Sequence, residues 1–208
     1  LYDRVPEELR LRMFYPPARP RYPAYLRRQA RLMETVQEQD ILLSYPYESI
    51  RPLLDTVREA ASDISVVSIK ITLYRIARES KLAESLITAS ENGKEVTVIM
   101  ELRARFDEQN NIDWANRLEK AGCRVIYGSG AYKVHAKLCL ITRRALNRTR
   151  YITHVGTGNY NEKTAELYTD LALITANEEV GQDAANFFRN MDLDNLYGEY
   201  RHLLVAPY

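Results

Sequence analysis

The chain has 208 residues, of which 46% are hydrophobic and 27% charged, and its 29 Lys and Arg nearly balance its 28 Asp and Glu. This composition supports a buried core and excludes a disordered chain. No apolar run approaches the roughly 20 residues that a membrane-spanning helix needs, and no signal peptide is visible. Cys123 and Cys139 lie in apolar runs without metal-binding spacing, which indicates buried thiols of a reducing compartment.

Residues 1–40 differ from the rest of the chain, because they contain five prolines, eight arginines and no glycine. Proline removes a backbone donor and disfavours helix in the residue before it, so we expect an irregular connector here. The pattern becomes compatible with a helix over 24–39. The chain starts at Leu1 without Met, so we expect a piece of a longer protein, with a connector over 1–40 and a catalytic domain over 41–208.

From residue 41 onward, predicted strands and helices alternate. Strands are expected over 41–43, 66–73, 95–102, 123–127, 136–142, 151–155 and 170–175, with an edge strand over 202–205. Helices are expected from 48 or 49, over 80–90 ending at Asn92-Gly93, over 111–121 ending at Gly122, and over 182–188. This order predicts an α/β fold with a mixed sheet and helices on both faces, and ligands bound beyond the strand ends.

His135 and Lys137 stand at the head of the apolar run 138–141. Residues two apart on a strand point to the same face, so we expect the imidazole and the ammonium to share one pocket. The turn 156–159 (Gly-Thr-Gly-Asn) follows the next strand and offers backbone N–H groups to that pocket. The stretch 120–161 contains eight bases and no acid, which concentrates anions. A nucleophile, cations and such a turn suit a phosphoryl group.

Two arginines follow predicted strands. Arg75 comes after 66–73, and Arg105 follows 95–102. An arginine fork holds two phosphate oxygens through parallel hydrogen bonds. On spacing alone, the sequence favours a helix-cap or ion-pair role for each arginine over a phosphate site, and Asp107 and Glu108 lie close enough to Arg105 to pair with it. Lys133 flanks the histidine and either binds phosphate or only shields the pocket mouth.

Five blocks, in order, resemble the bacterial polyphosphate kinases that work through a phosphohistidine. They are 70–75 (KITLYR), 101–108 (ELRARFDE), 133–137 (KVHAK), 156–161 (GTGNYN) and 164–170 (TAELYTD). Members of this family are built from a head, a helical region and two phospholipase-D-like domains. The chain resembles the first of these two domains together with the connector that leads into it.

The resemblance implies roles for six side chains: His135, Lys137, Arg75, Arg105, Tyr168 and Asn159. His135 would carry the phosphoryl group, with Lys137 beside it. Arg75 and Arg105 match the Mg²⁺–phosphate site, but an arginine is itself a cation, so we expect each to bind phosphate oxygens that in turn hold the metal. Tyr168 would contact the nucleotide, and Asn159 belongs to the glycine turn.

The implied reaction is reversible transfer of the γ-phosphate of ATP to a polyphosphate chain, with Mg²⁺ as cofactor. ATP, ADP and polyphosphate are the expected partners, and nucleic acid is not. The resemblance also implies a cytoplasmic parent protein with peripheral membrane association and a homo-oligomer formed through domains outside this chain. The family's second catalytic histidine would lie in the following domain, so we expect little synthesis by this segment alone.

Two alternatives remain open. A phospholipase-D-type phosphodiesterase or nuclease uses the same histidine–lysine chemistry. It usually carries an acid five residues after the lysine, where this chain has Thr142, and it needs a second His-x-Lys copy. A non-catalytic module would bind polyphosphate without covalent chemistry. His154 and His202 receive no functional role; His154 is expected to point inward.

Overall fold

The computed structural model describes residues 4–15, 19–26, 31–104, 106–128, 132–146 and 148–206. The strands are β1 (Ile41–Tyr45), β2 (Val66–Leu73), β3 (Glu95–Met100), β4 (Arg124–Tyr127), β5 (Leu138–Ala145), β6 (Arg148–Gly156) and β7 (Asp170–Thr175). The helices are α1 (Glu7–Met13), α2 (Leu32–Glu38), α3 (Arg51–Ser62), α4 (Lys81–Glu91), α5 (Glu108–Lys120) and α6 (Glu178–Asp192), with a 3-10 turn, η2 (Thr164–Glu166).

Local chemistry sets the helix boundaries. Ser80 accepts a hydrogen bond from the Ala83 N–H at the start of α4, and Asn177 caps the first turn of α6 in the same way. Gly93 and Gly122 follow the ends of α4 and α5 with φ of 80° and 89°, a region that favours glycine. These glycines confirm the predicted helix ends.

The sheet is mixed, with the order β1-β7-β6-β5-β2-β3-β4. Strands β2, β3 and β4 run parallel, and β5 pairs with β2 in the antiparallel sense, as do all the pairs from β5 to β1. The direction of the sheet therefore reverses between β2 and β5. This reversal places the start of β5 beside the carboxyl end of β2.

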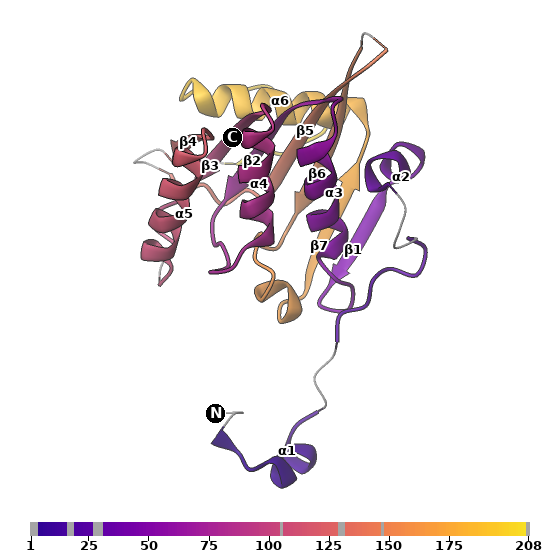
Figure 1. Cartoon of the computed structure of the whole chain (residues 1–208), viewed down its shortest axis with the longest axis vertical. Coiled ribbons are helices and arrows are strands. Elements are labelled where there is room, and N and C mark those ends of the chain that lie inside the picture. The colour runs from indigo at the N-terminus through magenta and orange to yellow at the C-terminus, as the bar shows by residue number, and fades with distance from the viewer. Residues whose placement is uncertain are drawn as a thin grey trace.

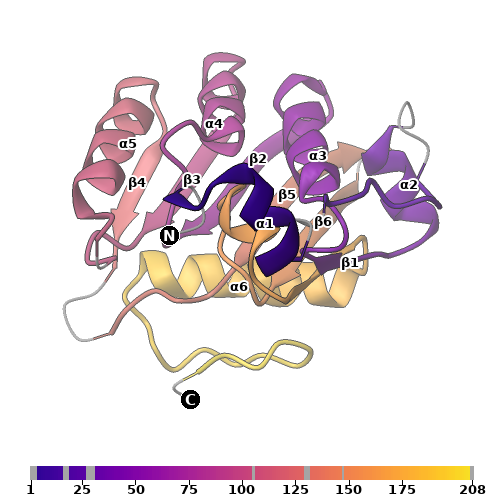
Figure 2. The same ribbon diagram turned by 90° about the horizontal axis from the view of Figure 1, so that it is seen from below.

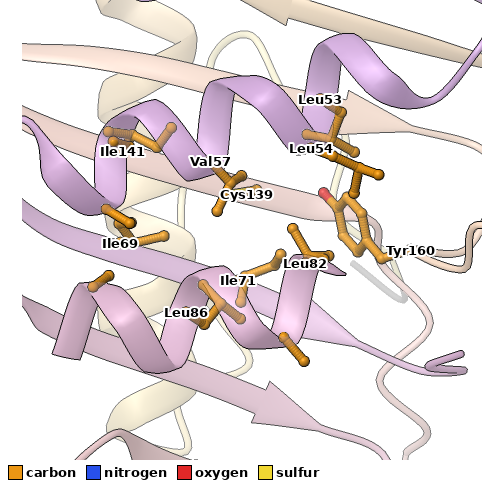
Figure 3. Packing of buried hydrophobic residues seen from close by; sticks show 14 of the residues in the cluster. Leu53, Leu54, Val57, Ile69, Ile71, Leu82, Leu86, Cys139, Ile141 and Tyr160 are labelled. Carbon is orange, nitrogen blue, oxygen red and sulfur yellow. The ribbon is translucent and has the colours of Figure 1, made fainter. Parts of the chain in front are cut away.

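Helices cover both faces of the sheet, as predicted. Figure 2 shows α3, α4 and α5 on one face and α6 on the other. On the first face, Val57 and Leu86 pack over Ile69, Ile71 and Cys139 (Figure 3). On the second face, Phe187 and Phe188 of α6 form a smaller cluster with Leu138 and Leu140 of the sheet. The cysteines at 123 and 139 are both buried and free.

Three sequence predictions need correction. Strand β5 begins at Leu138 rather than at Ala136, because the Ala136 carbonyl accepts a hydrogen bond from the Thr72 hydroxyl. The edge strand predicted over 202–205 is wrong. Three successive N–H groups, those of 201–203, donate to the carboxylate of Asp183 instead of to a neighbouring strand. The predicted helix over 24–39 is shorter: α2 covers Leu32–Glu38, and 27–30 lie outside the described residues.

Helix α1 lies apart from the sheet. Figure 1 shows α1 well away from the other elements, and Leu9 and Met13 of this helix are exposed. Among the described residues, no helix is both long and apolar enough to cross a membrane. The predicted division into a connector over 1–40 and a catalytic domain over 41–208 stays a prediction.

Candidate active site

The residues that the sequence analysis singled out lie near one edge of the sheet, where each of the seven strands has one of its ends. Strands β1, β2, β3, β4 and β6 end there, and β5 and β7 begin there. The register Ile71↔Cys139 brings the start of β5 to the end of β2, and Gly156↔Ala172 brings the end of β6 to the start of β7. Segments as far apart in sequence as Tyr45 at the end of β1 and Asp170 at the start of β7 therefore meet at this edge.

His135 lies in the extended segment that leads into β5, and its side chain is exposed. Its ring meets the ring of Tyr74 edge-on, with 5.0 Å between the centroids. Partial burial, together with the nearby charge of Lys137, lowers the pKa of His135 below its ordinary 6.5. A neutral imidazole, which has a free nitrogen lone pair, is therefore the main form at pH 7.

Lys137 is 6% exposed, and its ammonium points back along the segment. Its Nζ donates to the His135 carbonyl at 2.5 Å and lies 5.4 Å from the centre of the Tyr74 ring. Burial lowers the pKa of Lys137 to about 8, while the carboxylate of Asp170 opposes that shift. His135 and Lys137 thus both contact Tyr74, although both residues precede β5 instead of lying within it. Lys137 is buried, whereas His135 is exposed to solvent.

The other predicted cations line this edge in different ways. Arg75 follows β2, and its Nε lies 3.6 Å from an oxygen of Asp107. Lys133 is exposed and donates to the Arg103 carbonyl at 3.2 Å. Arg105 lies outside the described residues. Asp107 is an ion-pair partner of Arg75, which follows the parallel strand β2. The carboxyl ends of parallel strands are where ligands bind in such sheets.

Two backbone N–H groups of the glycine turn at the end of β6 already donate hydrogen bonds within the sheet. The N–H groups of Gly156 and Thr157 donate to the carbonyls of Lys137 and Leu171, so neither is open to a ligand as the sequence suggested. The Thr157 hydroxyl donates to Asp170 at 2.7 Å. Asn159 is half-buried, and within the described part of the chain its Oδ1 accepts no hydrogen bond.

Gly158 permits a close approach to Asp170. A Cβ at Gly158 would lie 2.6 Å from a carboxylate oxygen of Asp170, closer than atoms can pack. Asp170 can therefore stand against the turn while its charge acts on Lys137. The Asp170 carboxylate thus accepts a hydrogen bond from the glycine turn and also acts electrostatically on Lys137.

The remaining predicted residues occupy distinct places. Tyr168 is 61% exposed, between η2 and β7. His154 points inward, as expected; complete burial lowers its pKa to about 3, and its Nδ1 lies 2.8 Å from the Tyr160 hydroxyl. His202 is on the surface with its Nε2 3.3 Å from Glu179.

Three residues of this edge escaped the sequence reasoning. Tyr74 contacts both His135 and Lys137. Thr72 and Glu101 hydrogen-bond to the backbone on either side of the histidine. All three fall inside or beside the sequence blocks quoted above, but their contacts depend on strand register, which those blocks do not reveal.

The mixed seven-stranded sheet covered by helices on both faces is an α/β fold of the phospholipase-D-like kind. The Nuc protein of Salmonella typhimurium, a phospholipase D family member, shares this fold with a TM-score of 0.57 at 16% identity, over 78% of this chain and 99% of that one. The family model for polyphosphate kinase C-terminal domain 1 matches residues 31–195. The chain therefore belongs to the polyphosphate kinase family.

Individual relatives agree with this assignment. The polyphosphate kinase of Staphylococcus saprophyticus is 50% identical over 171 residues, which is 82% of this chain and 24% of that protein. That of Bacillus cereus is 45% identical over 196 residues, 94% and 28% of the two chains. The crystal structure of the Porphyromonas gingivalis enzyme matches with a TM-score of 0.83 at 35% identity, over 98% of this chain and 34% of that one. The chain thus spans about a quarter of the curated relatives' length.

Proposed function

We propose that this chain is the phosphoryl-carrying domain of a polyphosphate kinase, the first of two phospholipase-D-like domains in its parent protein. The observation that carries the proposal is the exposed imidazole of His135, held against Tyr74 beside Lys137 where the strand ends meet. Membership of the polyphosphate kinase family supports ATP and polyphosphate as substrates. The reaction is proposed for the whole protein, of which this chain is a part.

In the first half-reaction, a neutral ring nitrogen of His135 attacks the γ-phosphorus of ATP. The N–P bond forms as the bond to the β,γ-bridging oxygen breaks, and ADP leaves. In the second, a terminal phosphate oxygen of polyphosphate attacks the same phosphorus, the N–P bond breaks, and the chain grows by one unit. The same steps in reverse make ATP.

The cations of this edge would stabilise charge on the transferring group, because positioning and electrostatics dominate phosphoryl transfer. Lys137 stands nearest to His135, while Arg75 and Lys133 flank it on neighbouring segments. We assign Arg105 and Asn159 to the same phosphate site and Tyr168 to the nucleotide, on the family resemblance.

Mg²⁺ would neutralise phosphate charge when bound with the nucleotide. Two carboxylates at this edge are already engaged: Asp107 by Arg75 and Asp170 by Thr157. Across the described ranges, no group of three His, Cys, Asp or Glu side chains is arranged to hold a metal. The donors present fit phosphate oxygens, so we propose that Arg75 and Arg105 act on the phosphates that bind the ion.

The test uses the full-length protein incubated briefly with γ-labelled ATP and Mg²⁺. We expect an acid-labile, base-stable label in the wild type and none in His135→Ala. His202→Ala is the matched control, because that histidine is exposed but pairs with Glu179 outside the site. No label in the wild type, or equal label in His135→Ala, would favour a phosphodiesterase or a polyphosphate-binding module.

Three wider properties are proposed for the parent protein on its family resemblance alone. They are a cytoplasmic location, peripheral membrane association and homo-oligomerisation through regions outside this chain. We also expect the isolated 208-residue chain to make little polyphosphate. Robust synthesis by that chain would contradict the need for a second domain.

A further inference from the structure

A buried carboxylate stands directly behind the histidine segment. Glu101 follows β3 and is 5% exposed. One of its oxygens accepts the N–H of Arg103 at 2.8 Å, and the other accepts the N–H of Val134 at 3.1 Å. Burying a charge is unfavourable unless hydrogen bonds compensate it, and these two bonds supply that compensation.

The end of β4 closes over the same carboxylate. Gly128 donates its N–H to the Met100 carbonyl at 3.2 Å. A Cβ on Gly128 would lie 2.9 Å from a methyl group of Val134 and 3.4 Å from Glu101 Oε2. The absence of a side chain at Gly128 therefore lets the ends of β3 and β4 and the histidine segment meet around Glu101.

The histidine segment is held from both sides. Glu101 binds the backbone one residue before His135. The Thr72 hydroxyl donates to the Ala136 carbonyl at 2.7 Å and accepts from the Leu138 N–H at 3.1 Å. Residues 132–137 belong to no strand, so these side-chain hydrogen bonds, together with the Gly156 N–H on the Lys137 carbonyl, hold the segment in place.

Glu101 also ties this segment to the turn that follows β3. Its second oxygen holds the Arg103 N–H, and Lys133 Nζ donates to the Arg103 carbonyl at 3.2 Å. The turn and the histidine segment are thus joined at two points. Movement of one must move the other.

We propose that Glu101 is a positioning residue for His135, which sets the backbone from which the imidazole reaches the phosphorus. The inference rests on the proposed phosphoryl transfer through His135. A displacement of about 1 Å in a reacting group can reduce a rate about 100-fold. Loss of the Glu101–Val134 bond is therefore expected to slow chemistry more than it weakens substrate binding.

The experiment compares Glu101→Gln with wild type in the full-length protein. The amide keeps the size of the side chain but leaves only one oxygen for two N–H donors. We expect the rate constant for His135 phosphorylation to fall about 10- to 100-fold, with the KM for ATP changed by less than about threefold. Glu101→Asp keeps the charge but shortens the side chain, so we expect a smaller fall in the phosphorylation rate constant than in Glu101→Gln. It replaces Glu101→Gln as the test variant if the Gln variant does not fold.

Glu59→Gln is the matched control. Glu59 also accepts two backbone N–H groups, those of Leu32 and Met33 at 2.7 and 3.3 Å, but through one oxygen, and it lies on α3 near the start of β2, at the opposite edge of the sheet. Gln at position 59 keeps an oxygen that can accept both N–H groups, so we expect only the Glu101 variant to lower the phosphorylation rate. Equal rates in wild type and Glu101→Gln would overturn the inference while leaving the proposed function intact.

A second readout keeps the two proposals separate. If the wild type takes no label, the proposed function fails, and Glu101 is judged by the rate at which diethyl pyrocarbonate modifies His135, followed by peptide mass. That rate needs no kinase activity. We expect it to change at least about threefold in Glu101→Gln and to stay unchanged in Glu59→Gln, because only the first releases the segment. An unchanged rate in Glu101→Gln would overturn the positioning role.

Discussion

Replacing Lys137 by methionine should stabilise the fold while abolishing phosphoryl transfer. Burial lowers the pKa of Lys137 from 10.5 to about 8, against the opposing charge of Asp170. That difference of about 2.5 units corresponds to roughly 3 kcal/mol, by which the fold disfavours the charged ammonium at neutral pH. Methionine has a similar length and no charge, so it removes this penalty.

Several contributions reduce the gain. The variant loses the hydrogen bond from Nζ to the His135 carbonyl, worth about 1 kcal/mol, and the contact with the Tyr74 ring, worth about 0.5 kcal/mol. Solvent at the edge of the sheet screens the ammonium and lowers the penalty further. We expect a net increase of about 1 kcal/mol in the free energy of unfolding at pH 7.

The pH dependence separates this reasoning from a simple packing effect. Between about pH 8 and pH 10.5 the unfolded chain holds a proton on Lys137 that the native state does not, so wild-type stability rises with pH in that window. The advantage of Lys137→Met should therefore shrink as pH rises. Urea unfolding of the wild type and of Lys137→Met at several pH values from 7 to about 10.5 measures this stability difference. Lys133→Met, at an exposed lysine, is the control. A variant less stable than wild type at pH 7, or a constant difference at every pH, would refute the reasoning.

Three other changes test the same edge. Asp170→Asn removes the charge that raises the pKa of Lys137, so the alkaline limit of phosphorylation should move below about pH 8; an unmoved limit in rate–pH profiles would count against this. The pKa of His135 is lowered, so as pH falls from 7 wild-type phosphorylation should lose rate only below pH 6.5, and single-turnover rates that already fall between pH 7 and pH 6.5 would contradict this. Gly158→Ala forces Asp170 aside and should reduce stability by about 1–3 kcal/mol in thermal unfolding, whereas an unchanged midpoint would show that the turn adapts.

Elements whose signals are local were predictable from the sequence. The β-branched run of β2 and the glycines after α4 and α5 each act within a few residues, and the structure has them where expected. The strand predicted over 202–205 failed for a reason outside its own sequence. Asp183, almost twenty residues earlier, takes the N–H groups that a strand would have offered to a neighbour. Propensity alone contains no information about such a partner.

In the candidate site, too, contacts between residues close in sequence were predictable and contacts between distant segments were not. The pairing of His135 with Lys137 was predictable because they are two residues apart. Their contact with Tyr74 was not, because it depends on the register between β2 and β5, more than sixty residues apart. The glycine turn was expected to offer N–H groups, yet Gly156 and Thr157 use theirs within the sheet. A motif therefore predicted a chemistry, while the register of the sheet determined which atoms of the site remain free to bind a ligand.

The reversal of strand direction between β2 and β5 has a consequence for the growing chain. The edge around His135 needs Thr72 from β2 on one side and Asp170 from β7 on the other, and β7 is the last strand in sequence. Pairing between distant segments is slow, because the intervening loop must close first. A nascent polypeptide that extends only as far as His135 therefore has the histidine without its surroundings. The edge around His135 can be complete only after β7 leaves the ribosome, so the order of translation sets when this edge can first form.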